Sequence, residues 1–278
     1  MRIVITGVDG FIGKNLRVRL RELGHTDVVG ITRHTRASEA QAAYASADFV
    51  FHLAGVNRPN DPAEFAEGND ALTGHICKAL TDAGRHAPLV LASSTQATRD
   101  NLYGVSKRAA EAHVRAYSRA APASVYVFRL TNVFGKWARP DYNSAVATFC
   151  HNISRGLPIT VNDPTAPLQL VYIDDVVAAF VAVLDRHTGV APTPTESGVE
   201  LQSADGYFQA GPVYATTVGA VADTLRNFAG SRTSLTIPEV GTGLLRALYS
   251  TYVSYLPTER FAYPVARHGD ARGVFVEM

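Results

Sequence analysis

The sequence predicts an α/β fold, in which a doubly wound parallel sheet carries helices on both faces and a smaller lobe follows. Three observations support this prediction. Short β-branched runs alternate repeatedly with stretches of helical apolar spacing up to residue 130. A glycine-rich turn directly follows the first run, and the alternation loosens beyond Gly135. Such alternation requires crossover connections and therefore a parallel sheet.

The elements of the first half follow from these patterns. We expect strands at residues 2–6, 28–32, 49–54, 89–93 and 125–130, and helices at 11–23, 63–83 and 102–120. About 17 residues separate the second and third strands, which is short for a crossover helix plus an extra strand.

The second half has a looser pattern. We expect helices at 144–155, 218–228 and 244–255, and a strand that runs into a helix within LQLVYIDDVVAAFVAVL. Residues 189–212 are rich in Gly, Pro, Ser and Thr, and they are predicted to form a surface connection.

Composition excludes several classes of protein. Lys plus Arg number 26 and Asp plus Glu 25, so no charge excess points to nucleic acid or to an anionic membrane. No apolar run approaches the roughly 18 residues of a membrane span. The N-terminus leads straight into the glycine turn instead of a signal peptide, so we expect a cytoplasmic protein. Cys77 and Cys150 offer neither a disulfide framework nor metal-ligand spacing, and no metal site is assigned.

The stretch TGVDGFIG places Gly7, Gly10 and Gly13 between the first strand and the first helix. Glycines at these positions permit a tight turn and let the backbone approach a pyrophosphate at the helix N-terminus. A strand before the turn and an amphipathic helix after it are the context that this motif requires. The sequence therefore predicts a Rossmann-like dinucleotide site.

The end of the second strand indicates which dinucleotide is bound. A site for NAD(H) places an acidic residue there to bind the ribose, whereas an arginine accommodates a 2′-phosphate. Arg33 and Arg36 follow this strand, and no carboxylate occurs between Asp27 and Glu39. NADP(H) is therefore favoured over NAD(H).

A candidate catalytic group lies after the fourth strand. Ser93 and Ser94 close that strand, and YGVSK begins the next helix, so Tyr103 and Lys107 share one helix face. A serine and a tyrosine hydroxyl could then bind one carbonyl oxygen, while Lys107 holds the ribose and lowers the pKa of Tyr103.

Several motifs together resemble those of a known family. TGVDGFIG, DFVFHLAG, SSTQA, YGVSK and RLTNVFG resemble the extended short-chain dehydrogenase/reductases, or NAD-dependent epimerase/dehydratase family, that act on nucleotide sugars. The similarity is closest to the reductase domain of bifunctional capsular polysaccharide biosynthesis enzymes of the CapF type. FHLAGVNRP, SSTQATRDNLYG, NVFGKWARPDYNSAVATFCHNI, VNDPTAPLQLVYIDD and STYVSYLP carry it over most of the chain.

The resemblance implies a role for each matching residue. Tyr103 is the general acid/base, Lys107 its partner and Ser94 the third member, with Ser93 as the alternative. The implied cofactor-binding residues are Gly7, Asp9, Gly10, Phe11, Ile12, Gly13, Arg33, Arg36, Leu53, Ala54, Gly55, Asn69, Ser93, Tyr103, Lys107 and Leu130, and His52 is expected near the ribose and nicotinamide. The implied substrate-binding residues are Asn57, Arg58, Ser94, Asn132, Lys136, Trp137, Arg139 and Asn143. For Trp137 and Asn143, loop packing alone stays an equal alternative.

The resemblance also implies an activity. It is that of an oxidoreductase in which NADPH reduces the C4 keto group of a UDP-linked 2-acetamido-2,6-dideoxy-hexos-4-ulose. The product would serve N-acetyl-L-fucosamine synthesis for capsule or O-antigen. A nucleotide-sugar C4-epimerase and a non-catalytic NADP-binding regulator stay open as alternatives. Thr95 and Gln96 stand where nucleotide-sugar dehydratases carry an acidic pair, which disfavours a dehydratase. A homodimer is expected from the same resemblance.

The expected domain organisation has three parts. Residues 1–185 form the NADP-binding Rossmann domain, with 137–168 contributing to the substrate cleft, and residues 186–265 form a substrate-binding lobe. RHGDARGVFVEM, at 267–278, resembles the opening of a C-terminal cupin domain, so residues 266–278 are expected to begin a domain that is absent from this chain. The metal site and C3-epimerase activity of that domain are not assigned.

Overall fold

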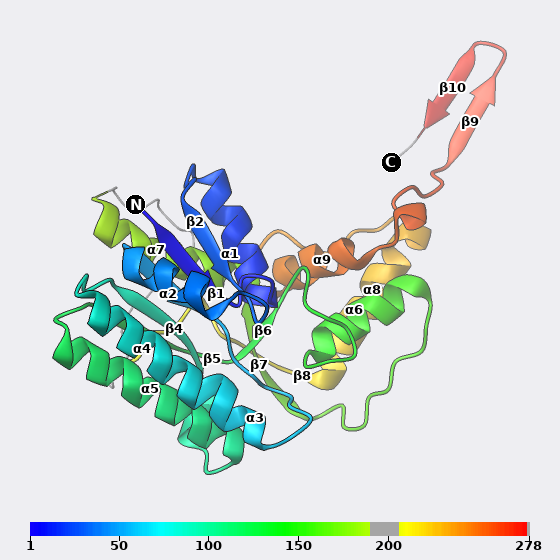
Figure 1. The fold of residues 1–278 in the computed structure, drawn as a ribbon. Coiled ribbons are helices and arrows are strands. Elements are labelled where there is room, and N and C mark those ends of the chain that lie inside the picture. The colour runs from blue at the N-terminus through cyan, green and yellow to red at the C-terminus, as the bar shows by residue number, and fades with distance from the viewer. Residues whose placement is uncertain (190–205, 277–278) are drawn as a thin grey trace. The chain divides into compact units, whose positions relative to one another are not determined.

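The computed structural model describes residues 1–189 and 206–276 (Figure 1). Most of the surface connection predicted at 189–212 lies outside these described residues. The chain divides into two compact units, each built from two segments. The first comprises Met1–Thr131 and Val171–Val213, and the second comprises Asn132–Leu170 and Tyr214–Met278.

The first unit contains a five-stranded parallel sheet. Its strands lie in the order β2-β1-β3-β4-β5. Every neighbouring pair is parallel, with Ile3 opposite Phe49 and Ser94 opposite Leu130 in the register. The predicted Rossmann-like, doubly wound sheet is therefore confirmed. The strands are β1 (Ile3–Thr6), β2 (Val28–Ile31), β3 (Phe49–His52), β4 (Leu89–Ser94) and β5 (Val125–Leu130).

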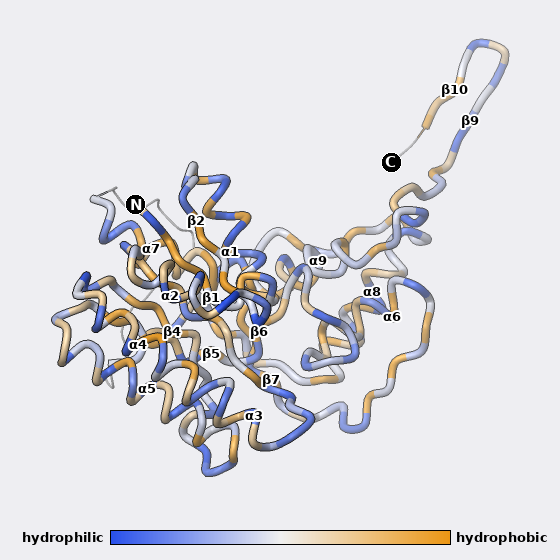
Figure 2. The backbone as a smooth tube through the Cα atoms, viewed as in Figure 1, coloured by the Kyte–Doolittle hydropathy of each residue, from blue (hydrophilic) through white to orange (hydrophobic). Residues whose placement is uncertain are grey.

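Helices cover both faces of this sheet (Figure 1). Helices α1 (Phe11–Glu22) and α7 (Ile173–Thr188) pack together on one face, and α2 (Ala37–Ser46), α4 (Leu72–Ala83) and α5 (Leu102–Ala120) pack on the other. Because side chains alternate along a strand, each strand supplies both cores. The strands are accordingly hydrophobic along most of their length (Figure 2).

Aromatic and aliphatic residues divide between these two cores. The ring of Phe180 on α7 lies 6.0 Å from that of Phe51 and 4.9 Å from that of Phe128. Val50 and Leu89 belong instead to the cluster on the opposite face, beneath α2, α4 and α5. Burial on both faces is what a parallel sheet requires.

The connections of this unit differ from the sequence prediction in two places. Residues 37–46 form α2, so the short link between β2 and β3 holds a helix but no extra strand. The helix predicted at 63–83 is interrupted. It consists of α3 (Ala63–Phe65), the π-helical turn η1 (Ala66–Ala71) and α4, and the buried Asn69 lies in the wide π turn.

A short segment also extends the free edge of β5. Phe208 forms an isolated parallel bridge with Phe128. Its amide donates to the carbonyl of Val127 at 2.8 Å, and its carbonyl accepts from the amide of Arg129 at 3.2 Å. The sequence pattern had not indicated this pairing.

The second unit combines a small sheet with three helices. The helices α6 (Ala145–Arg155), α8 (Val218–Ser234) and α9 (Gly243–Tyr255) pack against one another. The sheet has the order β6-β7-β8, and β7 is antiparallel to β8. Its strands are β6 (Asn132–Phe134), β7 (Pro167–Tyr172) and β8 (Tyr214–Thr217), of which β6 and β8 were not predicted.

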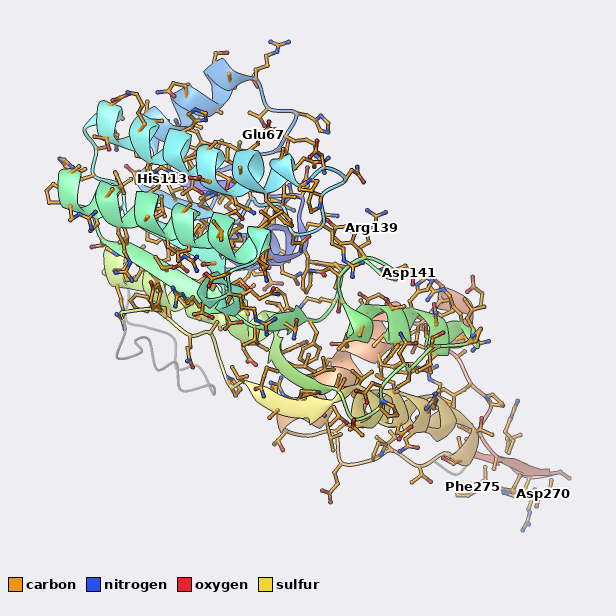
Figure 3. All side chains as sticks on the ribbon, turned by 90° about the horizontal axis from the view of Figure 1, so that it is seen from below. Glu67, His113, Arg139, Asp141, Asp270 and Phe275 are labelled. Atoms are coloured by element: carbon orange, nitrogen blue, oxygen red, sulfur yellow. The ribbon has the colours of Figure 1, made fainter. Side chains whose placement is uncertain are left out.

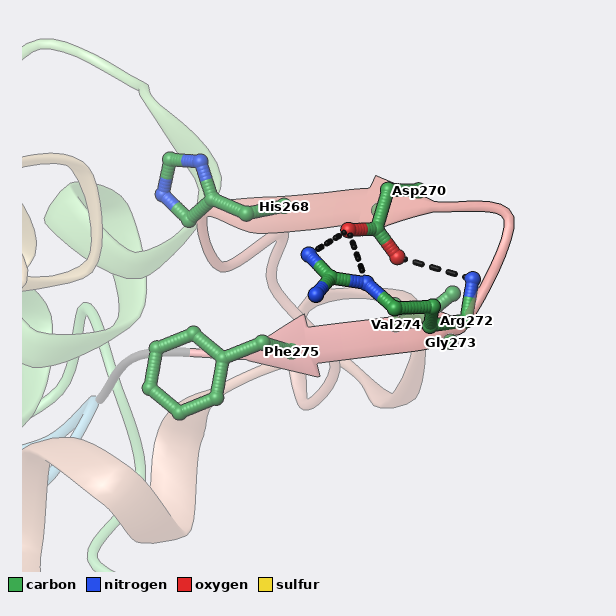
Figure 4. A pocket seen from close by; sticks show the side chains of 7 residues that line it. His268, Asp270, Arg272, Gly273, Val274 and Phe275 are labelled. Atoms are coloured by element: carbon green, nitrogen blue, oxygen red, sulfur yellow. Dashed lines mark hydrogen bonds and ion pairs between the residues drawn. The ribbon is translucent and has the colours of Figure 1, made fainter.

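The last described residues form a short hairpin after the turn η3 (Thr258–Arg260). Strands β9 (Arg267–Asp270) and β10 (Gly273–Val276) are antiparallel, and all their residues are exposed. The shallow hollow on this hairpin contains Arg272, whose guanidinium group bonds the carboxylate of Asp270 at 2.6 Å (Figure 4). Within the described residues, no helix has the length and apolarity needed to cross a membrane.

Candidate active site

The YGVSK stretch forms the beginning of α5, and its position depends on Gly104. The side chain of Asn101 caps the helix by accepting the amide of Gly104 at 2.8 Å. A Cβ atom on Gly104 would come within 2.4 Å of the carbonyl oxygens of Gln96 and Arg99. Only glycine therefore lets the helix begin against the turn η2 (Thr95–Thr98) that follows β4.

This close approach brings Tyr103 to the end of β4. Burial raises the pKa of Tyr103, and a hydrogen bond with the side chain of Ser94 opposes that rise. The Ser94 hydroxyl also accepts the amide of Gln96 at 3.1 Å. The ring of Phe65 packs against that of Tyr103, with centroids 5.7 Å apart. The two hydroxyl groups thus form one site at the carboxyl edge of the sheet.

Lys107 lies beneath Tyr103 on the same helix face. Its Nζ donates to the carbonyl of Ala92 at 3.2 Å and lies 5.9 Å from the centre of the Tyr103 ring. Burial lowers the pKa of Lys107 to about 8, and the negative charge of Glu111 acts in the opposite direction. A Cβ atom on Gly55 would come within 3.0 Å of Nζ, so the chain after β3 passes directly over the ammonium group.

The two adjacent serines make different contacts. Ser94 bonds with Tyr103, whereas the Ser93 hydroxyl donates to Oε1 of Glu111 at 2.6 Å. The two serines that the sequence left as alternatives therefore have different partners, and Ser94 is the one that bonds Tyr103.

The glycine turn after β1 forms a cradle that side chains would fill. Gly7 has a φ of +69°, and a Cβ atom there would come within 2.8 Å of the backbone of Ala54. On Gly13 it would come within 2.3 Å of the Gly7 oxygen. Gly10 caps α1 without a side-chain bond, and the first turn of α1 has no acidic residue. Backbone amides at this helix end suit a pyrophosphate.

A series of buried hydrogen bonds links the end of β1, just before this turn, to β3 and α4. Thr73 donates to the carbonyl of Asn69 at 2.6 Å, so its oxygen must accept from Nε2 of His52, 2.8 Å away. Nδ1 of His52 is then an acceptor, and it receives the hydroxyl of Thr6 at 2.8 Å. Thr6 in turn accepts the amide of Ala54 at 3.2 Å. His52 is fully buried, and its burial lowers its pKa to about 3, assisted by the charge of Lys107.

Asn69 connects the segment after β3 with α5. Its Oδ1 accepts the amide of Val56 at 2.9 Å, and its Nδ2 donates to the Val56 carbonyl at 2.9 Å and to the hydroxyl of Ser106 at 3.0 Å. Ser106 donates to the carbonyl of Tyr103 at 2.8 Å. The π turn thereby fixes the start of α5.

Arg33 and Arg36, which are proposed to bind the 2′-phosphate of the cofactor, lie after β2. A turn bonded from Thr32 to Thr35 follows the strand and presents Arg33 to solvent. Arg36 is also exposed and lies 3.8 Å from Glu39. The other cofactor candidates surround the sheet edge: Asp9, Phe11 and Ile12 lie at the glycine turn, Leu53 and Gly55 follow β3, and Leu130 ends β5.

The substrate candidates are spread over both units. Asn57 and Arg58 are exposed in the first unit, after β3. In the second unit, Asn132 lies on β6 and donates to the carbonyl of Gln169 at 3.2 Å. The rest lie on the loop between β6 and α6: Lys136, Trp137, Arg139 and Asn143.

The loop between β6 and α6 has an unusual conformation. Trp137 adopts a φ of +69°, which is rare for a bulky residue, and half of its surface is exposed. Nζ of Lys136 lies 6.0 Å from the Trp137 ring, and the guanidinium of Arg139 lies 5.3 Å from the ring of Tyr142. Figure 3 shows Arg139 on this loop. Strained, exposed residues of this kind cluster at binding sites.

Sequence reasoning missed a largely buried ion pair that joins α5 to β5. Glu111 and Arg129 form a two-point contact, with nitrogen-to-oxygen distances of 2.9 and 2.7 Å. Two signals could have revealed it. Arg129 is the charged residue of the otherwise apolar run VYVFRL, and Glu111 follows Lys107 at helical spacing.

Known proteins match this chain over most of its length. Residues 3–194 match the sequence model of the NAD dependent epimerase/dehydratase family. All 278 residues align at 49% identity with 71% of UDP-2-acetamido-2,6-beta-L-arabino-hexul-4-ose reductase of Pseudomonas aeruginosa strain PA103.

Solved structures are also similar. The capsular polysaccharide assembling protein CapF from Staphylococcus aureus superposes with a TM-score of 0.85 at 39% identity, over 99% of this chain and 71% of that protein. UDP-glucuronic acid 4-epimerase from Bacillus cereus, in complex with NAD, gives a TM-score of 0.72 at 18% identity, over 92% of this chain and 98% of that one. This second likeness shows the shared fold.

Proposed function

Because this chain belongs to the NAD-dependent epimerase/dehydratase family, we propose that it reduces the C4 keto group of a UDP-linked 2-acetamido-2,6-dideoxy-hexos-4-ulose with NADPH. The observation that supports it most is the hydroxyl pair of Ser94 and Tyr103 above Lys107, in a chain 49% identical throughout to a named hexul-4-ose reductase. The similarity to a capsular polysaccharide assembling protein favours a role in N-acetyl-L-fucosamine synthesis for capsule or O-antigen.

The residues of the first unit fit a nicotinamide dinucleotide. The cradle of Gly7, Gly10 and Gly13 leaves backbone amides for the pyrophosphate. Lys107, beneath the chain at Gly55, is positioned to hold a ribose. When bound, the dinucleotide supplies the hydride. The exposed Arg33 favours a 2′-phosphate, and hence NADP(H) over NAD(H).

The chain's own residues would supply the proton that the keto oxygen takes up during the reduction. The Tyr103 and Ser94 hydroxyls would both bond the keto oxygen, and Tyr103 would donate its proton to that oxygen as the alkoxide develops. The cation of Lys107 would stabilise the tyrosinate that remains, which lowers the effective pKa of Tyr103. Burial, which raises the pKa of Tyr103, keeps the phenol protonated before turnover.

The two residues after Ser94 argue against a dehydratase reaction. Thr95 and Gln96 occupy η2, and the Thr95 hydroxyl donates to the carbonyl of Leu130 at 3.5 Å. Neither side chain can act as the carboxylate base that a dehydratase uses to remove an α-proton. Reduction needs no such base.

We also propose a role for the polar residues that the motifs single out. Asn57, Arg58 and Asn132 would contact the sugar nucleotide, as would the loop residues Lys136, Trp137, Arg139 and Asn143. The left-handed backbone and exposure of Trp137 support this role, because a residue strained only for packing would be expected to be buried.

Two broader proposals accompany the activity. We propose a cytoplasmic protein. We also propose a homodimer that forms through the helical residues 63–83, which comprise α3, η1 and α4, and residues 103–120 of α5. Leu102 and Val105 on α5 are 61% and 46% exposed, which suits an interface. His113 on α5 and Asp70 on η1 pair at 2.7 Å, so these two elements are also joined to each other (Figure 3 labels His113). Light scattering at micromolar concentration would give the mass of a monomer if the proposal is wrong.

One incubation tests the proposed activity. The protein is mixed with NADPH and the UDP-linked 4-keto sugar, and cofactor absorbance and sugar products are followed together. We expect one NADPH oxidised for each sugar reduced. Sugar interconversion without net oxidation would instead indicate a C4-epimerase. Cofactor binding without any turnover would indicate a non-catalytic NADP-binding regulator.

A further inference from the structure

A buried carboxylate lies one helical turn beyond Lys107. The side chain of Glu111 is 3% exposed, and it receives three hydrogen bonds. Nε and Nη2 of Arg129 donate to its two oxygens at 2.9 and 2.7 Å, and the hydroxyl of Ser93 donates at 2.6 Å. A carboxyl group with three donors acts purely as an acceptor, as the ionised form does.

We propose that Glu111 is a positioning residue for the reduction, because its buried negative charge keeps Lys107 cationic beneath Tyr103 while Arg129 and Ser93 hold that charge in place. The proposal rests on the function proposed above. Glu111 would touch neither substrate nor cofactor, and it would act through Lys107.

The surroundings of Lys107 explain why such a charge is needed. The Lys107 side chain is buried, and burial disfavours its ammonium form. The titratable groups that face it are the neutral His52 on β3, Tyr103 on its own helix and Glu111. Glu111 is the group among these that favours the cation. Without it, Lys107 would lose its proton at a lower pH, and the tyrosinate of Tyr103 would lack its stabilising partner.

Tyr207, next to the edge strand β5, also restrains the ion pair of Glu111 and Arg129. The guanidinium of Arg129 lies 3.5 Å from the ring centre of Tyr207, and that of Arg115 lies 4.7 Å from the same ring. Tyr207 directly precedes Phe208, which bridges to β5. This stacking restricts Arg129 to the orientation in which it bonds Glu111 at two points.

The test measures the ionisation of Lys107 directly. Competitive labelling with acetic anhydride, read by peptide mass spectrometry across pH, gives the midpoint at which Lys107 becomes reactive without any substrate. We expect Glu111→Gln to lower this midpoint by about one pH unit, because a buried charge one helical turn away on α5 is removed. The alkaline limb of kcat should move down with it. The control is Asp82→Asn, which removes an exposed carboxylate paired with Lys78, and it should leave both values unchanged.

A second variant is measured in case Glu111→Gln does not fold. Glu111→Met combined with Arg129→Met replaces the whole pair by apolar side chains and leaves no buried unpaired charge. It should lower the labelling midpoint by less than Glu111→Gln does, because the cation of Arg129 is removed together with the carboxylate. An unchanged midpoint in a folded variant of either kind overturns the proposal. If the wild-type protein does not oxidise NADPH with the 4-keto sugar, the proposed function fails, and the labelling result still decides the influence of Glu111 on Lys107.

Discussion

The backbone of Gly104 lies so close to the carbonyl of Arg99 that a Cβ atom between them would come within 2.4 Å of the oxygen. This approach presses the start of α5 against the turn after β4. The hydrogen bond between Tyr103 and Ser94 depends on it, since the two residues lie on either side of that turn.

Replacing Gly104 by alanine should therefore damage both stability and activity. Overpacking against backbone atoms typically costs about 1–3 kcal/mol, and the displaced helix would move Tyr103 away from Ser94. Urea unfolding and kcat measure the two effects. Gly230→Ala is the matched control, because Gly230 lies within α8 with open space around it. Alanine there should stabilise the protein by up to about 1 kcal/mol. Equal unfolding curves for Gly104→Ala and the wild type would contradict the argument.

Tyr103→Phe should remove the proton donor while leaving most of the cofactor affinity intact, because the glycine turn and Lys107 remain. Loss of a general acid typically reduces kcat by about 10²–10⁴-fold. Fluorescence titration with NADPH should show a much smaller loss of affinity than of kcat. Tyr126→Phe serves as control, since the Tyr126 hydroxyl bonds His187 at 2.8 Å, away from the Ser94–Tyr103 pair. Turnover that survives in Tyr103→Phe would disprove the assignment of Tyr103 as the acid.

Arg33→Gln should weaken NADPH much more than NADH. A charge-assisted bond to a phosphate contributes about 1.5–3 kcal/mol, so KM for NADPH should rise about 10- to 100-fold. The KM for NADH should change little, because that cofactor lacks the 2′-phosphate. Arg119→Gln, which removes an exposed charge at the end of α5, should affect neither cofactor. An equal loss for both cofactors would argue against a 2′-phosphate contact.

The buried His52 should make folding stability fall in acid. Its pKa in the folded protein is lowered to about 3 from the ordinary histidine value of 6.5, so the unfolded chain binds the proton first. The stability it contributes is complete above pH 6.5 and is lost progressively as the pH falls toward 3. Between pH 7 and pH 5 this amounts to about 2 kcal/mol.

The measurement is urea unfolding at several pH values for the wild type and for His52→Gln. The difference in free energy of unfolding between the two proteins should shrink as the pH falls. A difference that stays constant with pH would mean that His52 does not titrate in this way.

Local pattern was sufficient for much of the fold. The predicted helix at 102–120 and strand at 125–130 have the bounds that the structure gives, because the apolar pattern changes at these positions in the sequence. The glycine turn and the Tyr103–Lys107 spacing are local as well. These patterns could therefore be recognised in the sequence, and the chemistry assigned to them stays a prediction.

Features that depend on contacts between residues far apart in the sequence could not be predicted from local patterns. The π turn at 66–71 depends on the bonds between Asn69 and Val56, which no helical periodicity encodes. The pairing of Glu111 with Arg129 joins a helix to a strand. The helix α2 has an alanine-rich sequence with little apolar contrast between its faces, so its pattern was weak.

The bridge from Phe208 to β5 has a consequence for the behaviour of the protein in concentrated solution. An outermost strand with unpaired amides and carbonyls is a template on which other chains can add and aggregate. Phe208 covers the middle of β5, where Val127 and Arg129 would otherwise offer these groups. The opposite outer strand, β2, is only four residues long. Detachment of the segment at Phe208 would therefore expose the longer of the two edges to self-association.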